Sequence, residues 1–210
     1  AIALGEATKT IPYLTQDLKG YIFTVALGAS TTTDDASGQV IHTSSYRPDD
    51  KKIRKICKCF LGKIKQVPPT FSAVKIKGQR AYQIARKGYT NFKLAERDLW
   101  ISELEMLERI NEDKVKMKLI CGKGGYVRSI ARDMGEKLGC FGHVINLTRV
   151  SSGPFSISHA LLDKFIFEEN VEKVVQHIRP VASTLGHLAK IECTFTEANE
   201  IQHGKAIKLN

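Results

Sequence analysis

The segment spanning residues 121–132, CGKGGYVRSIAR, combines a glycine-rich turn with a phenol and a guanidinium. Its three glycines let the backbone turn sharply and approach a ligand closely. A strand end that leads into a helix start leaves free backbone N–H groups, which favour an anion. Tyr126 and Arg128 are two residues apart, so in an extended stretch both side chains face one cavity. The structural alternative is that Tyr126 fills the core and Arg128 pairs with an acid such as Asp133.

The second chemical feature is a concentration of positive charge in residues 51–97. This segment contains fourteen Lys and Arg residues and a single acid, Glu96, so it carries +13 of a chain whose net charge is +10, and the remainder carries −3. Clustered cations favour a polyanion because binding releases counterions. Aromatic residues interleaved with the cations favour nucleic acid over a merely solvated helix face, which is the alternative for one such run.

Other chemistries find weaker support in the sequence. Cys57 and Cys59 lack a second Cys/His pair at zinc spacing, and Cys57 falls on an apolar helix face, so a core role is expected. The six histidines form no HxxxH pair, and no G-x-S-x-G elbow is present, although a dispersed Ser–His–Asp or Cys–His arrangement stays open. The glycines at 122–125 lack Walker spacing. We therefore predict neither a metal nor a cofactor.

Composition excludes several classes of protein. The chain has 210 residues, 42% hydrophobic and 26% charged, which is typical of a globular protein rather than a disordered one. It contains neither an apolar run of about 18 residues nor a cleavable signal, so membrane and secreted proteins are not expected. Five cysteines without a disulfide framework favour a reducing, cytoplasmic location. The sequence opens mid-pattern at Ala1 and stops at Asn210 without a polar tail, so we expect residues to be missing at both ends.

Hydrophobic periodicity predicts the elements that position these residues. Strand-like alternation covers 21–27, 39–43, 72–76, 97–107, 115–121, 144–151 and 190–194. Helical spacing covers 8–18, 49–61, 78–86, 127–138, 157–178 and 196–202, with a loop at 28–38 and a linker at 180–186. Because strands and helices do not alternate regularly, we predict an α+β fold, a mostly antiparallel mixed sheet with inserted helices.

Four stretches together resemble the TruB family of tRNA pseudouridine synthases. They are LGEATK at 4–9, KGYIFTVALGASTTTDDASGQV at 19–40, PPTFSAVKIKGQRAY at 68–82 and CGKGGYVRSIARDMGEKLGCFGHVINLTRV at 121–150. Their order and spacing agree with the family as well, and the bacterial form is the closer resemblance. The family usually has Thr at the position of Gly125.

The resemblance implies a domain organisation. Residues 1–165 correspond to the catalytic domain with the pseudouridine synthase fold, without its N-terminal segment. Residues 166–185 are expected to form a helix and linker, and 186–210 the start of a small, β-rich PUA domain that binds RNA.

The resemblance also implies a reaction. Family members isomerise uridine 55 in the T-loop of tRNA to pseudouridine, with no metal or cofactor, after flipping the base out of its stack. A nucleophilic aspartate assists the break of the glycosidic bond, and uracil reattaches through C5. That aspartate belongs to a motif upstream of the LGEATK-like segment. Neither Asp34 nor Asp35 matches this motif.

Four positions match the family's pocket. Tyr21 corresponds to a tyrosine that stacks on the flipped base and takes the C5 proton, for which a flat ring with a polar tip is suited. Tyr126 matches a tyrosine of the uracil pocket, and Leu147 matches an apolar wall. Arg128 matches an arginine that pairs with the catalytic aspartate and favours its ionised form.

The basic segment and the resemblance overlap at residues 68–97, which in relatives form an inserted segment that closes over the T-loop. The cations expected to contact phosphates are Lys75, Lys77, Arg80 and Arg86. The expected partner is the tRNA T-stem-loop, with no membrane, no protein partner and a monomeric enzyme. The alternatives are a non-catalytic RNA-binding or RNA-folding protein on this scaffold, and a guide-RNA-dependent synthase.

Overall fold

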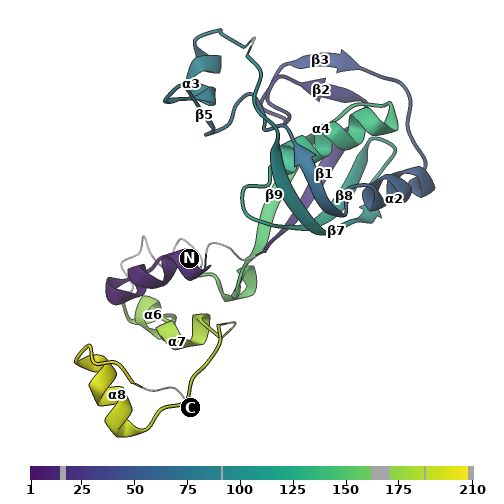
Figure 1. Ribbon diagram of the computed structural model, residues 1–210. Coiled ribbons are helices and arrows are strands. Elements are labelled where there is room, and N and C mark those ends of the chain that lie inside the picture. The colour runs from purple at the N-terminus through teal and green to yellow at the C-terminus, as the bar shows by residue number, and fades with distance from the viewer. Residues whose placement is uncertain (15–17, 91, 162–170, 187, 208–210) are drawn as a thin grey trace.

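The centre of the molecule is a six-stranded sheet (Figure 1). Its strand order is β10-β9-β1-β8-β7-β4, and every neighbouring pair is antiparallel. The strands are β1 (Lys19–Leu27), β4 (Gly62–Gln66), β7 (Arg97–Arg109), β8 (Lys114–Cys121), β9 (Gly142–Ser152) and β10 (Phe155–Ser156). The computed structural model describes residues 1–14, 18–90, 92–161, 171–186 and 188–207. An antiparallel sheet with inserted helices confirms the predicted α+β fold.

Helices α2 and α4 cover one face of this sheet (Figure 1). α4 (Val127–Leu138) packs on β1 and β9 and ends at Gly139, whose φ of 73° provides the left-handed C-cap. α2 (Asp50–Lys58) packs on β7 and α4, and the side chain of Asp49 caps its N-terminus by accepting from the backbone N–H of Lys52 at 2.8 Å. The predicted helices at 49–61 and 127–138 are therefore confirmed. The first of them, α2, ends three residues earlier than predicted, at Lys58.

The core lies between the sheet and these two helices. Alternate residues of β8, Val115, Met117 and Leu119, are fully buried, while the lysines between them lie on the opposite face. Phe23 of β1 and Ile130 of α4 complete the same cluster and are also fully buried. The predicted half-buried strand at 115–121 is confirmed.

Two small hairpins lie outside the main sheet. β2 (Ala29–Thr31) pairs with β3 (Val40–Thr43), so the loop predicted at 28–38 contains a short strand. β5 (Lys75–Ile76) pairs with β6 (Gln79–Arg80), and α3 (Ala81–Arg86) follows. The strand predicted at 72–76 is thus only two residues long. Among the described residues it pairs with β6 alone, which is itself two residues long.

Two strands of the sheet, β4 and the two-residue β10, were not predicted. β4 follows directly after α2, where a Gly62 φ of 84° reverses the chain, and it pairs with β7 at the sheet edge. The sequence predicts a helix that ends at residue 61 and no element over 62–66. Pairing with β7 decides the conformation instead.

The C-terminal part differs from expectation. The described helices here are η2 (Ile157–His159), α6 (Val171–Gln176), α7 (Val181–Thr184) and α8 (Phe195–Gln202), and those at the N-terminus are η1 (Gly5–Thr10) and α1 (Ile11–Leu14). The linker predicted at 180–186 contains α7, and the backbone at 190–194 forms no strand, because no described strand lies beside it to pair with. The middle of the helix predicted at 157–178 and the domain boundary at 165 lie outside the described residues. Within the described ranges, no helix is long and apolar enough to cross a bilayer.

Candidate functional site

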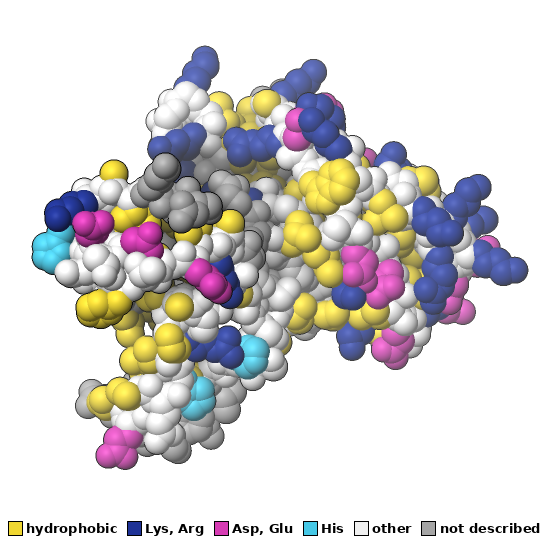
Figure 2. All heavy atoms as spheres, turned by 60° about the horizontal axis from the view of Figure 1, so that its bottom comes forward, with side chains coloured by type: hydrophobic (Ala, Val, Ile, Leu, Met, Phe, Trp, Pro, Cys, Tyr) yellow, Lys and Arg dark blue, Asp and Glu magenta, His cyan; other side chains and the backbone are white. Residues whose placement is uncertain are grey.

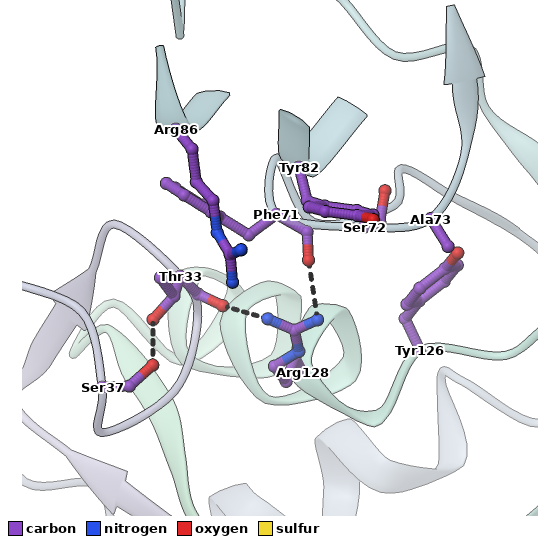
Figure 3. Close-up of a pocket in the computed structure, with 9 residues that line it drawn as sticks. All are labelled: Thr33, Ser37, Phe71, Ser72, Ala73, Tyr82, Arg86, Tyr126 and Arg128. Carbon is purple, nitrogen blue, oxygen red and sulfur yellow. Dashed lines mark hydrogen bonds between the residues drawn. The ribbon is translucent and has the colours of Figure 1, made fainter. Parts of the chain in front are cut away.

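A cavity of about 700 Å³ opens beside the N-terminus of α4 (Figure 3). Three segments that are distant in sequence surround it: the loop that joins β2 to β3, the segment before β5 together with α3, and the start of α4. The lining residues are Thr33, Ser37, Phe71, Ser72, Ala73, Tyr82, Arg86, Tyr126 and Arg128. Tyr126 and Arg128 both line this cavity, as predicted, but Arg128 lies in the first turn of α4 and not in the extended stretch from which the prediction was made.

Arg128 joins the three segments through its guanidinium. Nη1 donates to the backbone oxygen of Thr33 at 2.9 Å, and Nη2 donates to the backbone oxygen of Phe71 at 2.9 Å (Figure 3). Nη1 also donates to Oδ2 of Asp35 at 3.1 Å. The planar fork of donors in arginine suits such divergent acceptors. The structural alternative named Asp133 as the ionic partner, and the structure places Asp35 there instead.

Asp35 is the residue of this site that sequence reasoning missed. Its Oδ1 accepts from the Thr33 hydroxyl at 2.6 Å, the Ser37 hydroxyl at 2.5 Å and the Ser37 backbone N–H at 3.0 Å. Burial on its own raises the pKa of this carboxyl, but the hydrogen bonds from Ser37 and Thr33 and the charge of Arg128 outweigh burial and lower the pKa below its ordinary value. Asp35 is therefore an ionised, fixed acceptor for Arg128. An aspartate in a small polar loop carries no local signal of a partner 93 residues away.

Two hydrogen bonds from the Gln66 side chain to the backbone of Tyr126 hold this residue in place. Gln66 at the end of β4 accepts from the backbone N–H of Tyr126 at 2.9 Å and donates to its backbone oxygen at 3.1 Å. The preceding Gly125 is packed tightly, because a Cβ there would lie 2.8 Å from Sγ of Cys121 and 3.0 Å from Leu99. In this chain the Leu99 and Cys121 side chains thus occupy the space that a threonine at position 125 would need.

The wall opposite α4 is aromatic and cationic. The guanidinium of Arg86 lies over the ring of Tyr82, 5.4 Å from its centroid, and both side chains approach from α3 (Figure 3). Ser72 lines the same cavity and is only 3% exposed. Its hydroxyl has no hydrogen-bond partner within the described part of the chain. Aromatic faces beside a guanidinium suit stacking with a base and attraction of a phosphate.

Tyr21 and Leu147 are not among the residues that line this cavity. Tyr21 packs against the core on β1, directly opposite Arg149 of β9, and Leu147 stands directly opposite Phe23. Residues directly opposite on antiparallel strands point to the same face. Since Phe23 belongs to the core beneath α4, both predicted pocket residues lie on the α4 side of the sheet. Their approach to Tyr126 and Arg128 around a base remains a prediction.

The environment of Tyr21 shifts the titration of its phenol. Burial raises the pKa of Tyr21 above its ordinary value, and proximity to Cys121 adds to the rise, while the hydrogen-bonded Arg149 opposes it. The phenol is therefore protonated at neutral pH. The side chain of Leu147 is 47% exposed, so it offers an apolar surface that is open to a ligand.

The structure places the four cations predicted to contact phosphate in two positions, one at the cavity and three beside it. Arg86 reaches the cavity wall, whereas Lys75, Lys77 and Arg80 are exposed on the β5–β6 hairpin next to it. Cys57, expected in the core, is 2% exposed and packs there. The cavity therefore combines the guanidinium of Arg128, aromatic side chains in its wall and exposed cations on the neighbouring hairpin. This arrangement is suited to binding an RNA nucleotide.

Two family models match the chain. The model described as TruB family pseudouridylate synthase (N terminal domain) matches residues 1–127, and the model described as tRNA pseudouridylate synthase B C-terminal domain matches residues 128–186. The chain is 50% identical over 205 residues to tRNA pseudouridine synthase B of Ruegeria sp. (strain TM1040), covering 97% of this chain and 68% of that protein. It is 42% identical over 214 residues to the protein of that name from Ehrlichia ruminantium (strain Gardel), covering 100% of this chain and 72% of that protein.

Solved structures show the same fold. The structure titled "Crystal Structure of a Cbf5-Nop10-Gar1 Complex" matches with a TM-score of 0.67 and 26% identity, over 96% of this chain and 53% of that chain. A second, "Structure of H/ACA RNP bound to a substrate RNA containing 2'-deoxyuridine", matches with a TM-score of 0.67 and 21% identity, over 98% of this chain and 53% of that chain.

Proposed function

The chain belongs to the TruB family of pseudouridylate synthases, and on this basis we propose that it forms pseudouridine in tRNA by isomerising uridine 55 of the T-loop. The observation on which the proposal depends most is the cavity beside α4, where Tyr126 and Arg128 of the GGYVR motif meet the aromatic and cationic wall of α3. Half of the aligned residues are identical to those of proteins named tRNA pseudouridine synthase B, which supports tRNA as the substrate.

The reaction breaks the N1–C1′ glycosidic bond and forms a C5–C1′ bond. C5 loses its proton and N1 gains one, so that the product is an isomer of uridine. The target uridine leaves its stack and enters the space between β1 and the start of α4. Tyr21 stacks on the base, and its hydroxyl takes up the C5 proton as it gives its own proton to solvent, while Tyr126 and Leu147 line the slot. Arg128, already oriented by two backbone oxygens and Asp35, presents its charge to the nucleophilic carboxylate, whose motif matches no position of this sequence.

Phosphate contacts come from the insertion at residues 68–97, which contains α3. The cations assigned to them are Lys75, Lys77, Arg80 and Arg86. Arg86 stands at the cavity wall and the others on the adjoining hairpin, so they can follow an RNA strand that enters the cavity. Such contacts position the RNA without reading its sequence.

We further propose a cytoplasmic monomer that needs no guide RNA. Identity to tRNA pseudouridine synthase B is 50%, against 26% to the Cbf5 chain, whose structure is titled as a complex with Nop10 and Gar1. A synthase that engulfs one stem-loop needs no second subunit at its site. Sedimentation of the protein with and without a T-stem-loop measures this directly, and one copy per RNA is expected.

A T-stem-loop oligonucleotide with 5-fluorouridine at the target position tests the function. The protein expressed from its complete reading frame should form a stable adduct with this RNA in the absence of any other RNA or protein. Binding without an adduct, and without pseudouridine in a normal T-stem-loop, would favour the non-catalytic RNA-binding alternative. Activity that appears only with an added guide RNA would favour the guide-dependent one.

A further inference from the structure

A second arginine repeats the contacts of Arg128 one helical turn later. Arg132 on α4 donates from Nη1 to Oδ2 of Asp34 at 2.9 Å and from Nη2 to the backbone oxygen of Val67 at 2.9 Å. Arg128 likewise reaches Asp35 and a backbone oxygen four residues further along that segment, that of Phe71. Two arginines spaced four apart therefore connect the same three segments through two adjacent aspartates.

The second pair lies deeper than the first. The side chains of Arg132 and Asp34 are 19% and 11% exposed, against 24% and 27% for Arg128 and Asp35. Asp34 has a φ of 60°, a left-handed conformation that few residues other than glycine adopt. Its backbone is fixed as well, since its oxygen accepts from the N–H of Val144 at 3.1 Å. Such a strained, buried residue persists where its surroundings determine it.

We propose that Arg132 and Asp34 are positioning residues, whose buried ion pair orients the loop at 31–38 so that Asp35 meets Arg128. Arg128 contacts this loop at the Thr33 oxygen and at Asp35, and Val144 of β9 holds its backbone on another side. The Arg132–Asp34 pair adds a contact one residue away on the loop and one turn away on the helix, which further restricts how the loop can shift along α4. The inference depends on the proposed function, because its consequence for catalysis passes through Arg128.

The energetics of the pair favour a positioning role over a stabilising one. Burial raises the pKa of Asp34 to about 6, although Arg132 and Arg128 lower it and Asp133 adds to the rise. Those three side chains of α4 are the charged groups that face it, beside Asp35 of its own loop; β9 contributes backbone, through Val144. Because the folded-state pKa lies above the unfolded one, this carboxyl favours folding most when protonated, and that contribution is lost as pH rises from about 4 to about 6. In some proteins a buried ion pair that costs stability is retained for structural specificity.

The substitution that tests the proposal is Asp34→Asn, because asparagine also tolerates the left-handed backbone and removes only the charge. The matched control is Asp133→Asn, since Asp133 also accepts from Arg132, at 2.8 Å, but lies on the same helix and cannot tie the loop. We expect Asp34→Asn to lower kcat about tenfold or more on saturating T-stem-loop with an RNA affinity close to wild type. Asp133→Asn should leave both near wild type.

The pH profile separates positioning from a purely structural role. Wild-type kcat should fall as pH drops through about 6, where Asp34 takes up its proton, and the Asp34→Asn profile should lack this limb. Hydrogen exchange of residues 31–38 provides a readout without catalysis: protection should fall in Asp34→Asn and in Arg132→Lys but not in Asp133→Asn.

Equal loop protection in wild type and Asp34→Asn, or a wild-type kcat and pH profile in that variant, would overturn the proposal. Equal losses in Asp34→Asn and Asp133→Asn would do the same, since they would show a general effect of Arg132. A wild-type protein that binds the T-stem-loop but forms no pseudouridine would refute the proposed function instead, and the exchange measurement would still decide on the loop.

Discussion

At the scale of single residues, the guanidinium of Arg128 connects most of the site. It donates to two backbone oxygens and to Asp35, so it fixes the relative positions of three segments before any RNA binds. Preorganised charge of this kind is the main way in which an enzyme stabilises charge that develops in a reaction. The same contacts make the residue structural, so its catalytic and stabilising effects have to be measured separately.

Arg128→Lys tests this dual role. One ammonium cannot reach acceptors that diverge in this way, so we expect the free energy of unfolding to fall by about 1–3 kcal/mol and kcat to fall by about 10²–10³. Urea unfolding and single-turnover kinetics measure the two effects. A lysine variant with wild-type kcat would show that charge alone suffices there and that the geometry of the fork is irrelevant.

The orphaned hydroxyl of Ser72 gives a prediction of opposite sign. Ser72→Ala should raise the free energy of unfolding by about 1 kcal/mol, because it removes a buried polar atom without a partner in the described structure. Ser129→Ala is the matched control: Ser129 is fully buried and donates to the Val67 oxygen at 2.8 Å, so its loss should destabilise by about 1 kcal/mol. Equal destabilisation by both changes would show that the Ser72 hydroxyl is satisfied.

Tyr21→Phe separates the two tasks assigned to this ring. Phenylalanine keeps the flat face that stacks on the base and removes the hydroxyl that receives the proton. We expect kcat to fall by about 10²–10⁴ while the affinity for a T-stem-loop stays near that of wild type. Fluorescence anisotropy and rapid-quench kinetics provide the two values. A large loss of affinity with unchanged kcat would reverse the assignment.

At the scale of elements, the packing of α4 on β9 determines where Tyr126, Arg128 and Arg132 lie. Gly135 is at the closest approach, since a Cβ there would come within 2.3 Å of the backbone of Phe141 and Gly142. A neighbouring backbone cannot yield as a flexible side chain can. The glycine is therefore required for contact between helix and strand, and not for a special backbone conformation.

Gly135→Ala should accordingly lower the free energy of unfolding by about 1–3 kcal/mol or more, even though alanine is the better helix former. Glu136→Ala, one residue along the same helix and exposed, should change it by less than about 0.5 kcal/mol. Chemical denaturation compares the two. A stabilised Gly135→Ala variant would mean that α4 lies further from β9 than described.

The structure also divides the basic segment into two surfaces on different elements. Seven cations lie in residues 51–65, on α2 and β4, and seven follow on the insertion at 68–97. Figure 2 shows dark-blue side chains gathered at the right edge, the side on which Figure 1 draws α2, away from α3. Only the insertion adjoins the cavity. The two runs adjoin in the sequence, which does not show that α2 and α3 lie apart in the fold.

Matched triple substitutions compare the two surfaces. Changing Lys75, Lys77 and Arg80 to Gln should reduce the salt slope of T-stem-loop binding by about 0.7–0.9 per lost contact, with little effect on chemistry at saturation. Changing Lys51, Lys55 and Lys58 to Gln removes the same charge from α2 and should leave that slope nearly unchanged. Equal effects of the two sets would show that net charge, and not the insertion, drives binding.

Sequence patterns predicted elements better than they predicted partners. Strong alternation or amphipathic spacing located β1, β8, α2 and α4, because each buries a continuous apolar face. β4 escaped prediction because pairing with a distant segment, β7, decides its conformation rather than local preference. For the site, motif and spacing identified Tyr126 and Arg128. Phe71 and Ser72 reach the cavity, and Asp35 reaches Arg128, only through long-range packing, which no local pattern records.

At the scale of the whole molecule, the charge distribution and the fold serve one substrate. The chain carries +10 overall, with the excess concentrated in the segment that includes the cavity wall. Such a field speeds the approach of a polyanion and makes binding strongly dependent on salt. The sheet and α4 then supply the rigid support from which Tyr21, Tyr126 and Arg128 project.

Release of tritium from tRNA labelled at C5 of uridine tests the central claim most directly, because conversion to pseudouridine is what removes that hydrogen. With the protein expressed from its complete reading frame and no guide RNA, we expect one equivalent of tritium per tRNA, all from the T-loop uridine. The Arg128→Lys variant should release it about 10²–10³-fold more slowly. Tight, salt-dependent tRNA binding with no tritium release would contradict the account.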